Sequence, residues 1–228
     1  IHELAPYLAL EDIGAAAYEP DSGYADGAMA ANAYASRARD LGAVVRQGVA
    51  VTAIRFQAGR VTGVDTSDGV FHAPVVINAA GPWGTRLAAT AGFDTPVDAS
   101  RHQIAVFQRP SELAFEHHPT VGDFVQGFYM RSETGRLTLA GSIEATEAAH
   151  KVDPDRYVET VDMDFNAEMA ERTERRFPAM SAAGIGKGWA GLYDVSPDWH
   201  PIIGQMPGLE GFICAYGFSG SGFKMGPV

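Results

Sequence analysis

The sequence has little cysteine, few positive charges and no long apolar runs, and each of these shortages argues against a class of protein or bond. It has 17 lysines and arginines against 28 aspartates and glutamates, which gives a formal net charge of −11. Nucleic acids and anionic membrane surfaces reward positive charge, so this balance argues against both as partners. No apolar stretch approaches the length of a membrane span. We therefore expect neither a nucleic-acid-binding protein nor a membrane protein.

The single cysteine, Cys214, excludes an intrachain disulfide and favours a reducing compartment, the cytoplasm. It lies in the apolar run 211–216, so we predict a buried structural thiol. No signal peptide is visible. The chain does not begin with Met and opens in mid-pattern at Ile1, which we interpret as a fragment or a trimmed chain. The missing targeting signal is for that reason weak evidence about location.

Hydrophobic periodicity and turn signals predict a mixed α/β fold. Helices are expected at 27–41, 83–91 and 165–176, and a further helix should begin in 217–224. Strands are expected at 43–46, 49–56, 60–66, 69–71, 102–109, 124–131, 136–143, 187–195 and 212–216. The continuous apolar run 74–81 ends in Asn and Gly, a pattern typical of a fully buried parallel strand that leads into a tight turn. The chain thus divides into a parallel-sheet part, 1–95 with 186–228, and an antiparallel part, 96–185.

Two of these segments have little side-chain bulk where a cofactor could approach the backbone. The turn 78–81 reads Asn-Ala-Ala-Gly, and 217–224 holds three glycines and two serines just before a predicted helix. Backbone N–H groups at a helix start favour negative charge. From the residues alone, a tight strand–helix turn without a ligand and a glycine-rich helix cap remain alternatives for the two segments.

Three segments together carry a resemblance to a known family. They are 75–84 (VVINAAGPWG), 189–204 (WAGLYDVSPDWHPIIG) and 217–226 (GFSGSGFKMG), and the upstream 18–24 followed by a helix also fits. In this order and spacing they resemble the D-amino-acid-oxidase-like flavoproteins, which include glycine oxidase, sarcosine oxidase and dimethylglycine dehydrogenase. The likeness covers nearly the whole chain. It implies a partial FAD-binding, Rossmann-like domain at 1–95 and 186–228, interleaved with an antiparallel substrate domain at 96–185.

The resemblance also implies site residues. Lys224 would help to hold a substrate carboxylate over the flavin, together with an arginine outside these 228 residues, and Tyr193 would face the substrate. A solvated lysine and a core tyrosine are the alternatives. The residues implied to contact FAD are Val51, Ala79, Ala80, Gly81, Trp83, Gly191, Gly217, Ser219, Gly220, Ser221, Gly222, Phe223 and Lys224.

The sequence departs from the family pattern at several positions. Covalent members have a flavin-linking cysteine where this chain has Gly191, so FAD should be bound non-covalently. Oxidase members have a lysine that promotes reaction with oxygen, and the best alignment places Thr138 there. Ser221 stands where a histidine is frequent. A dehydrogenase that passes electrons to another carrier is therefore as plausible as an oxidase.

The Gly-x-Gly-x-x-Gly unit that grips a dinucleotide is absent from residues 1–228, and the glycines at 184–188 lie in the wrong context. We therefore expect an exposed apolar edge, and no tightly bound FAD in these residues alone. His117 and His118 lack further ligands at metal spacing, so no metal site is expected. His102 and His200 are expected to have structural roles.

The leading hypothesis is an FAD-dependent oxidoreductase that oxidises the CH–NH bond of an amino acid or of a secondary or tertiary amine. A flavin-dependent dehydrogenase of 2-hydroxy acids or glycerol phosphate is one alternative, and a non-catalytic domain that binds a partner is another. The substrate, the electron acceptor and the oligomeric state stay open.

Overall fold

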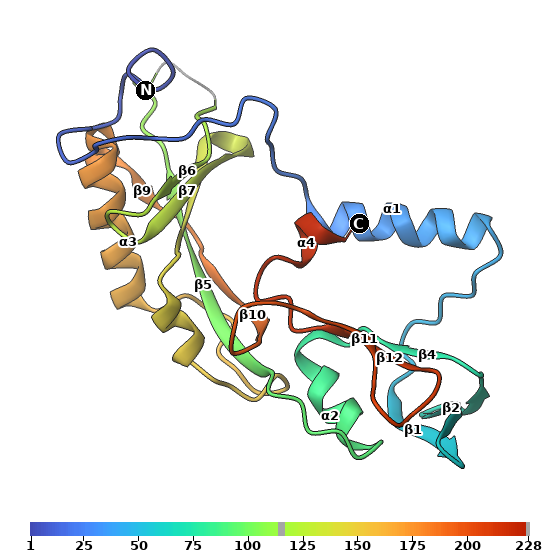
Figure 1. Ribbon diagram of the computed structural model, residues 1–228. Helices are drawn as coiled ribbons and strands as arrows, with labels where there is room; N and C mark the ends of the chain where they lie inside the picture. Colours follow the sequence, from blue (N-terminus) through green and yellow to red (C-terminus); the bar gives the residue numbers. More distant parts are fainter. Residues whose placement is uncertain (114–116, 227–228) are drawn as a thin grey trace. The chain divides into compact units, whose positions relative to one another are not determined.

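The computed structural model describes residues 1–113 and 117–226, coloured along the chain in Figure 1. The chain folds into two compact units. Unit 1 comprises Ile1–Gly23 and Ser100–Leu192, and unit 2 comprises Tyr24–Ala99 and Tyr193–Val228. Neither unit is continuous in sequence, because the chain passes between them at 23/24, at 99/100 and at 192/193.

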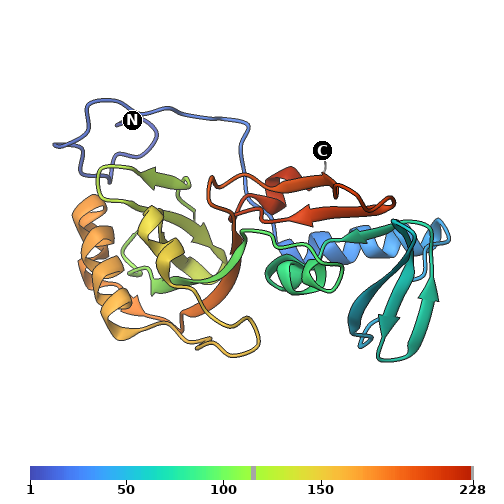
Figure 2. The ribbon, with the colours of Figure 1, turned by 60° about the horizontal axis from the view of Figure 1, so that its bottom comes forward.

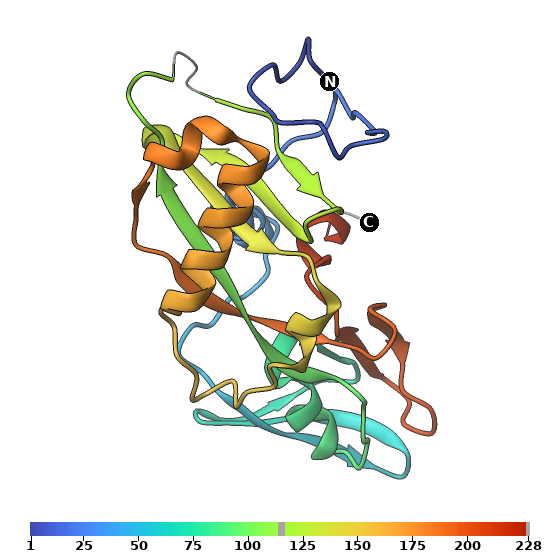
Figure 3. The same ribbon diagram turned by 90° about the vertical axis from the view of Figure 1, so that its left-hand side faces the viewer.

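Unit 1 is built on a sheet whose strand order is β10–β5–β8–β7–β6, with β9 also paired to β5. The strands are β5 (Asp98–Gln108), β6 (Val121–Asp123), β7 (Phe128–Glu133), β8 (Leu137–Ser142), β9 (Gly184–Ile185) and β10 (Trp189–Val195). The pairs β5–β8, β7–β8, β6–β7 and β5–β9 are antiparallel, as the sequence predicted. Helix α3 (Met163–Arg176) lies across one face of this sheet (Figure 3).

The core of unit 1 lies between this sheet and α3. Strand β7 alternates strictly between buried and half-buried residues, so Phe128 and Met130 point to the core while their neighbours point the other way. Phe165 and Met169 of α3 belong to the same buried cluster. Three short 3₁₀ helices, η2 (Thr134–Arg136), η3 (Ala145–Ala149) and η4 (Pro178–Ala182), connect the elements.

A buried arginine at the end of α3 ties the N-terminal segment of unit 1 to the sheet. Arg176 Nε donates to Asp123 Oδ2 at 2.7 Å, and both side chains are almost completely buried. Its Nη1 and Nη2 donate to the Asp12 carboxylate at 2.8 and 3.0 Å, and Nη1 also donates to the Ala9 carbonyl. Burial alone would raise the pKa of Asp123, but the Arg176 and Gln126 hydrogen bonds hold it below its usual value. One guanidinium thus joins β6, α3 and residues 9–12.

We predict that Arg176→Met destabilises unit 1 by about 3–5 kcal/mol, because it leaves the Asp123 carboxylate buried without its partner. Arg175→Met is the matched control, since Arg175 is exposed and pairs with exposed Glu171, so its loss should cost less than about 1 kcal/mol. Urea unfolding followed by circular dichroism measures both. Equal stabilities of the two variants would show that the Arg176 contacts contribute nothing.

Unit 2 contains two three-stranded sheets (Figure 2). One is the antiparallel meander β1 (Val51–Gln57), β2 (Arg60–Thr66) and β3 (Gly69–His72). The other has the order β11 (Ile202–Gln205), β12 (Phe212–Tyr216) and β4 (Val76–Asn78), in which β12 is antiparallel to β11 and parallel to β4. The helices are α1 (Gly27–Asp40), η1 (Gly81–Trp83), α2 (Gly84–Ala89) and α4 (Gly222–Met225).

The core of unit 2 is centred on β12. Phe212, Cys214 and Tyr216 are completely buried and pack with Ile54 and Val61 of the meander. The predicted burial of the Cys214 thiol is therefore confirmed, and that burial raises its pKa. The Tyr216 hydroxyl is also satisfied, because it lies 2.7 Å from the hydroxyl of Thr95.

Three expectations about local structure were wrong. Residues 43–46 form no strand, and Val44 is 80% exposed. The predicted strand at 124–131 begins only at Phe128, because the Asp123 carboxylate accepts the N–H groups of Val125 and Gln126 and closes a turn. The run 74–81 contains the parallel strand β4, but this strand is not fully buried.

Strand β4 lies at the edge of its sheet, with β12 on one side. Val75 and Ile77 are 51% and 61% exposed, whereas the side chain of Asn78 is buried. A strand is buried on both faces only when other elements cover both, and the apolar composition of a segment cannot show whether they do. The exposed apolar side chains agree with the apolar edge expected from the sequence.

The boundaries of the units differ from the expected division of the chain. The sequence predicted boundaries at 95/96 and 185/186, whereas the structure has them at 99/100 and 192/193. Residues 1–23 also belong to unit 1 and not to the unit of the residues that follow them. That unit 2 is a cofactor domain and unit 1 a substrate domain stays a prediction.

Candidate functional site

The turn after β4 is organised by the amide of Asn78. Its Nδ2 donates to the Gly84 carbonyl at 2.8 Å, and its Oδ1 accepts the Ala80 N–H at 3.2 Å. Gly84 itself lies against Tyr216, since an added Cβ would come within 2.6 Å of that ring. Gly81 has φ +51°, a conformation that favours glycine. The packing against Tyr216 thus requires glycine at position 84, the positive φ favours it at 81, and Asn78 is a structural residue.

A hollow of about 560 Å³ opens beside this turn. Its lining residues are Val51, Thr52, Ile77, Asn78, Ala79, Ala80, Trp83, Arg86 and Leu87. Val51, Ala79, Ala80 and Trp83, which the sequence placed at the cofactor, are therefore brought together, with Gly81 in the adjoining turn. Sequence reasoning missed Thr52, Ile77, Arg86 and Leu87. Arg86 follows Trp83 by three residues and could have been found from helical spacing.

The loop 217–221 is fixed to the end of β10 by hydrogen bonds. The Gly217 N–H donates to Asp194 Oδ2 at 2.6 Å, and the Ser219 N–H donates to the Asp194 carbonyl at 3.0 Å. Ser219 is buried with φ +51°, and its Oγ accepts the N–H of Ser196 at 3.2 Å. A non-glycine residue in this conformation is held there by its surroundings. The loop is consequently a preformed structure.

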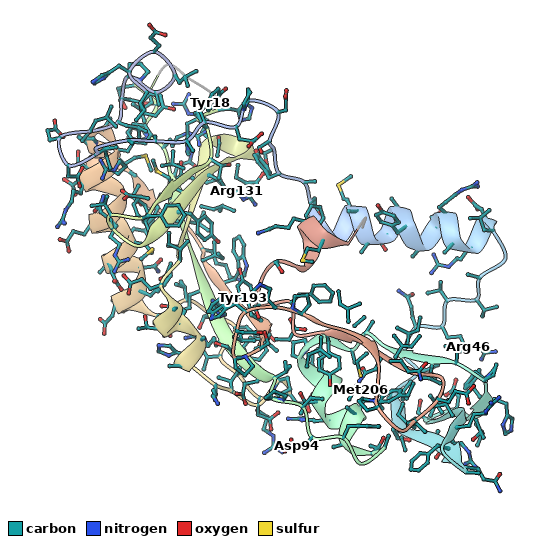
Figure 4. The ribbon with its side chains drawn as sticks, viewed as in Figure 1. Tyr18, Arg46, Asp94, Arg131, Tyr193 and Met206 are labelled. Atoms are coloured by element: carbon teal, nitrogen blue, oxygen red, sulfur yellow. The ribbon has the colours of Figure 1, made fainter. Side chains whose placement is uncertain are left out.

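Tyr193 packs against this loop at Gly220 and is labelled in Figure 4. A Cβ added to Gly220 would lie 2.9 Å from Tyr193 Cζ and closer still to Cε2. Gly220 also has φ +82°, so both space and backbone conformation require glycine. Burial raises the pKa of Tyr193, which keeps its hydroxyl protonated at neutral pH. The structure thus joins two of the predicted features, Tyr193 and the glycine loop.

A second hollow in unit 2, of about 580 Å³, lies between α1 and α4. It is lined by Gly27, Ala30, Ala31, Tyr34, Gly222, Phe223 and Gly226, of which Gly222 and Phe223 were predicted. Ser221 lies just before α4 and is half-buried, with its N–H and Oγ both donating to the Phe218 carbonyl. Lys224 is exposed on α4, and it makes no ion pair with any described residue.

Other candidates lie outside these surroundings. Gly191 belongs to β10 within unit 1, where an added Cβ would meet nothing within 4 Å. His200 is exposed, and its ring lies 2.7 Å from the Asp198 carbonyl. His102 is half-buried on β5. Within residues 1–113 and 117–226 no group of side chains could hold a metal ion, and no helix is long and apolar enough to cross a membrane.

Thr138 aligns with the lysine of the oxidase members. Its side chain is buried and faces α3. Its Oγ1 accepts from Arg109 Nη1 at 3.2 Å and lies 2.9 Å from His118 Nε2. The Pro119 carbonyl, 2.7 Å from Nδ1, can only accept, so Nδ1 carries the proton and Nε2 accepts from Thr138. His118 is thereby a structural residue, and burial lowers its pKa to about 4.

A family model described as "FAD dependent oxidoreductase", the DAO family, matches residues 1–228. The chain belongs to this family. Sarcosine dehydrogenase of Mus musculus mitochondria is 29% identical over 98% of this chain and 25% of its own length. The 4-methylaminobutanoate oxidase (formaldehyde-forming) of Paenarthrobacter nicotinovorans is 30% identical over 99% of this chain and 28% of its own. The chain thus spans about a quarter of the length of these relatives.

Among solved structures, L-proline dehydrogenase from P. horikoshii matches this DAO-family chain with a TM-score of 0.87 and 28% identity, over 99% of this chain and 59% of that one. Glycine oxidase from Bacillus cereus matches with a TM-score of 0.79 and 25% identity, over 99% and 58%. The family is FAD-dependent, so FAD is the implied cofactor. The hollow beside the 78–81 turn is lined by small residues, Ala79 and Ala80, and by the aromatic Trp83, and these residues fit part of such a cofactor.

We predict that Gly220→Ala destabilises unit 2 by about 2–4 kcal/mol, because a methyl group there overlaps the Tyr193 ring and strains the backbone. Gly92→Ala is the matched control: Gly92 has φ +84°, and an added Cβ meets nothing within 4 Å, so only about 1 kcal/mol of strain is expected. Thermal unfolding measures both. Equal losses would mean that the ring does not pack on the loop.

We also predict an acid-sensitive contribution from His118. Its folded-state pKa lies below its unfolded value, so its contribution to stability is present above about pH 6.5 and is lost as the pH falls towards 4. His118→Gln should therefore flatten the decline of unfolding free energy between pH 7 and 4, whereas exposed His200→Gln should not. Urea midpoints at several pH values test this. Parallel pH profiles for wild type and His118→Gln would contradict it.

Proposed function

We propose that this chain is the catalytic flavoprotein portion of an enzyme that oxidises the CH–NH bond of an N-methylated or other secondary amino acid. The observation that carries the proposal is the joint placement of Tyr193 and the preformed loop 217–221 in the unit that also holds the 78–81 hollow. The names of the relatives support the substrate class, since they include sarcosine, dimethylglycine and 4-methylaminobutanoate.

Three of the predicted residues, Tyr193, Lys224 and Gly222, have roles in this proposal. The Tyr193 hydroxyl, kept protonated, donates a hydrogen bond to the substrate. Lys224 offers its charge to the substrate carboxylate. Gly222 is the first residue of α4, so its N–H has no partner within that helix and can bind the cofactor. The Gly217 and Ser219 N–H groups donate to Asp194 and hold the loop in place, so the loop gains little order when ligands bind.

FAD, when bound, supplies the acceptor for the hydride that leaves the carbon next to the amine nitrogen, and water then hydrolyses the imine product. Gly191 provides no thiol, so we propose a non-covalent cofactor. We also expect residues 1–228 alone to retain no FAD. A cytoplasmic location, inferred from the single cysteine, stays a prediction.

The surroundings of Thr138 favour a dehydrogenase over an oxidase. A lysine at position 138 would place a second cation beside Arg109 in a buried site, and this is strongly unfavourable. The next residue in β8 is Leu139, whose side chain points to the opposite face and carries no charge. Neither Thr138 nor its neighbour Leu139 is thus the lysine that the resemblance associates with reaction towards oxygen.

The test is anaerobic reduction of the full-length protein's flavin. We expect its visible absorption to bleach with at least one of sarcosine, dimethylglycine, 4-methylaminobutanoate or L-proline, and not with glycolate as the hydroxy-acid control. Reoxidation by an artificial acceptor should be faster than reoxidation by air. A full-length protein that binds no flavin, or one bleached by glycolate alone, would overturn the proposal.

A further inference from the structure

A hollow of about 330 Å³ lies in unit 1 beside strand β6. Residues between 8 and 17 form one wall and residues 121–125 form the other, so both walls belong to the same unit although they are far apart in the sequence. Figure 1 shows the N-terminal segment and β6 at the same end of unit 1. The lining is mainly apolar and includes Leu10, Ile13 and Val121.

The hollow lies along the edge of β6 and not over one of its faces. Successive residues of a strand point to opposite faces, yet Val121, Gly122 and Asp123 follow one another and all border the hollow. Strand β6 is the last in the order of its sheet, with β7 as its neighbour on the inner side. The N–H and C=O groups on the outer side of such an edge strand can pair with an added strand.

Phe124 stands beside this edge on a turn that hydrogen bonds hold rigid. The side chain of Phe124 is 88% exposed and that of Val125 61%. Asp123 Oδ1 accepts the N–H groups of Val125 and Gln126, each at 3.0 Å, and Asp123 Oδ2 accepts from Gln126 Nε2 and Arg176 Nε. An aromatic side chain on a rigid turn loses little conformational freedom when it is covered, so it suits an interface anchor.

The rim of the hollow is acidic. Arg176 also lines the hollow, but it is buried and shared between two carboxylates, so this cluster keeps a negative charge. Residues 1–23 contain no lysine or arginine. A second copy of this chain, with its net charge of −11, would be repelled here, whereas lysine and arginine side chains would be attracted. The exposed carboxylates of this segment belong to Glu3, Glu11, Asp12, Glu19 and Asp21.

We propose that the β6 surface, residues 8–17 together with 121–125, binds an extended peptide segment of a partner protein in which apolar side chains alternate with lysines or arginines. The peptide backbone pairs with β6, the apolar side chains enter the hollow and contact Phe124, and the cations meet the acidic rim. Because β6 offers only three residues for pairing, the side-chain contacts supply most of the affinity. The surface lies within unit 1 and does not depend on the proposed function.

The test uses the full-length, FAD-loaded protein and a fluorescein-labelled peptide in which valine and lysine alternate. Two comparison peptides replace every lysine by glutamate or every valine by serine. Fluorescence anisotropy should show binding of the valine–lysine peptide, and binding of the other two that is weaker by about tenfold or more. Salt should weaken the binding of the valine–lysine peptide, because the charges on the rim are exposed.

Phe124→Ser should raise the dissociation constant of the valine–lysine peptide by about tenfold or more, because the peptide then covers no aromatic ring. Met163→Ser is the matched control, since Met163 is 87% exposed in the same unit and begins α3, about 20 Å along that helix from Arg176. It should leave the dissociation constant unchanged. Circular dichroism checks that both variants fold.

The acidic rim is tested by the double variant Glu11→Gln, Glu19→Gln. It should flatten the dependence of peptide affinity on salt concentration, because two of the attracting charges are gone. The double variant Asp68→Asn, Asp94→Asn removes the same charge from unit 2 and should keep the wild-type salt dependence. If both double variants behave alike, net charge and not this rim attracts the peptide, and the inference is wrong.

Hydrogen exchange of the full-length protein tests whether the edge of β6 is free to bind. We expect the valine–lysine peptide to slow exchange of amides in residues 121–123. Full protection without peptide would mean that another segment of the same protein covers this edge. A dimer in sedimentation analysis that Phe124→Ser dissociates would mean that a second copy does. Either result, or equal binding of the three peptides, would overturn the inference and leave the proposed function untouched.

Discussion

Three tyrosine rings lie directly on glycine backbone, and these contacts occur in both units. Tyr216 lies on Gly84, Tyr193 on Gly220 and Tyr129 on Gly141, each closer than a side chain at the glycine would allow. Each glycine lets the backbone approach the ring without a side chain in the way. The turn after β4, the loop before α4 and strand β7 each contain one of these contacts.

Among the described residues, the buried arginines and aspartate lie in unit 1. Arg176 satisfies two carboxylates and a carbonyl from distant segments, and Arg109 donates into the Thr138–His118 network. A buried cation is tolerated only when hydrogen bonds replace its hydration, so these contacts hold the segments in one arrangement. Unit 2 has a largely apolar core instead, with the Thr95–Tyr216 hydroxyl pair as a polar contact at its centre.

The sequence predicted well those features that are set by neighbouring residues. Helix α1 was predicted from its hydrophobic periodicity and from Gly42 after its end, and in the structure Asp26 caps it by accepting the Met29 N–H at 2.8 Å. The exposure of β4 depends on what covers it, and the Arg176–Asp12 contact joins residues 164 positions apart, so neither could be seen in a local window. The glycine loop was recognised through the family resemblance. Its hydrogen bonds to Asp194, 23 residues away in the sequence, could be seen only in the structure. Tyr34 was missed because nothing in its local pattern separates a residue that lines a hollow from a solvated one.

The strand order of the second sheet in unit 2 has a consequence for folding. Strand β12, residues 212–216, lies between β11 and β4, so the centre of that sheet is made from residues that are synthesised more than 130 positions after β4. Until it arrives, β4 has neither its parallel neighbour nor the aromatic cluster that packs behind it, and Val75 and Ile77 add to the apolar surface left open. Such pairing across more than 130 residues closes a long loop and is slow compared with hairpin formation in the β1–β3 meander. Until β12 pairs, this apolar surface is open to aggregation and to chaperone binding.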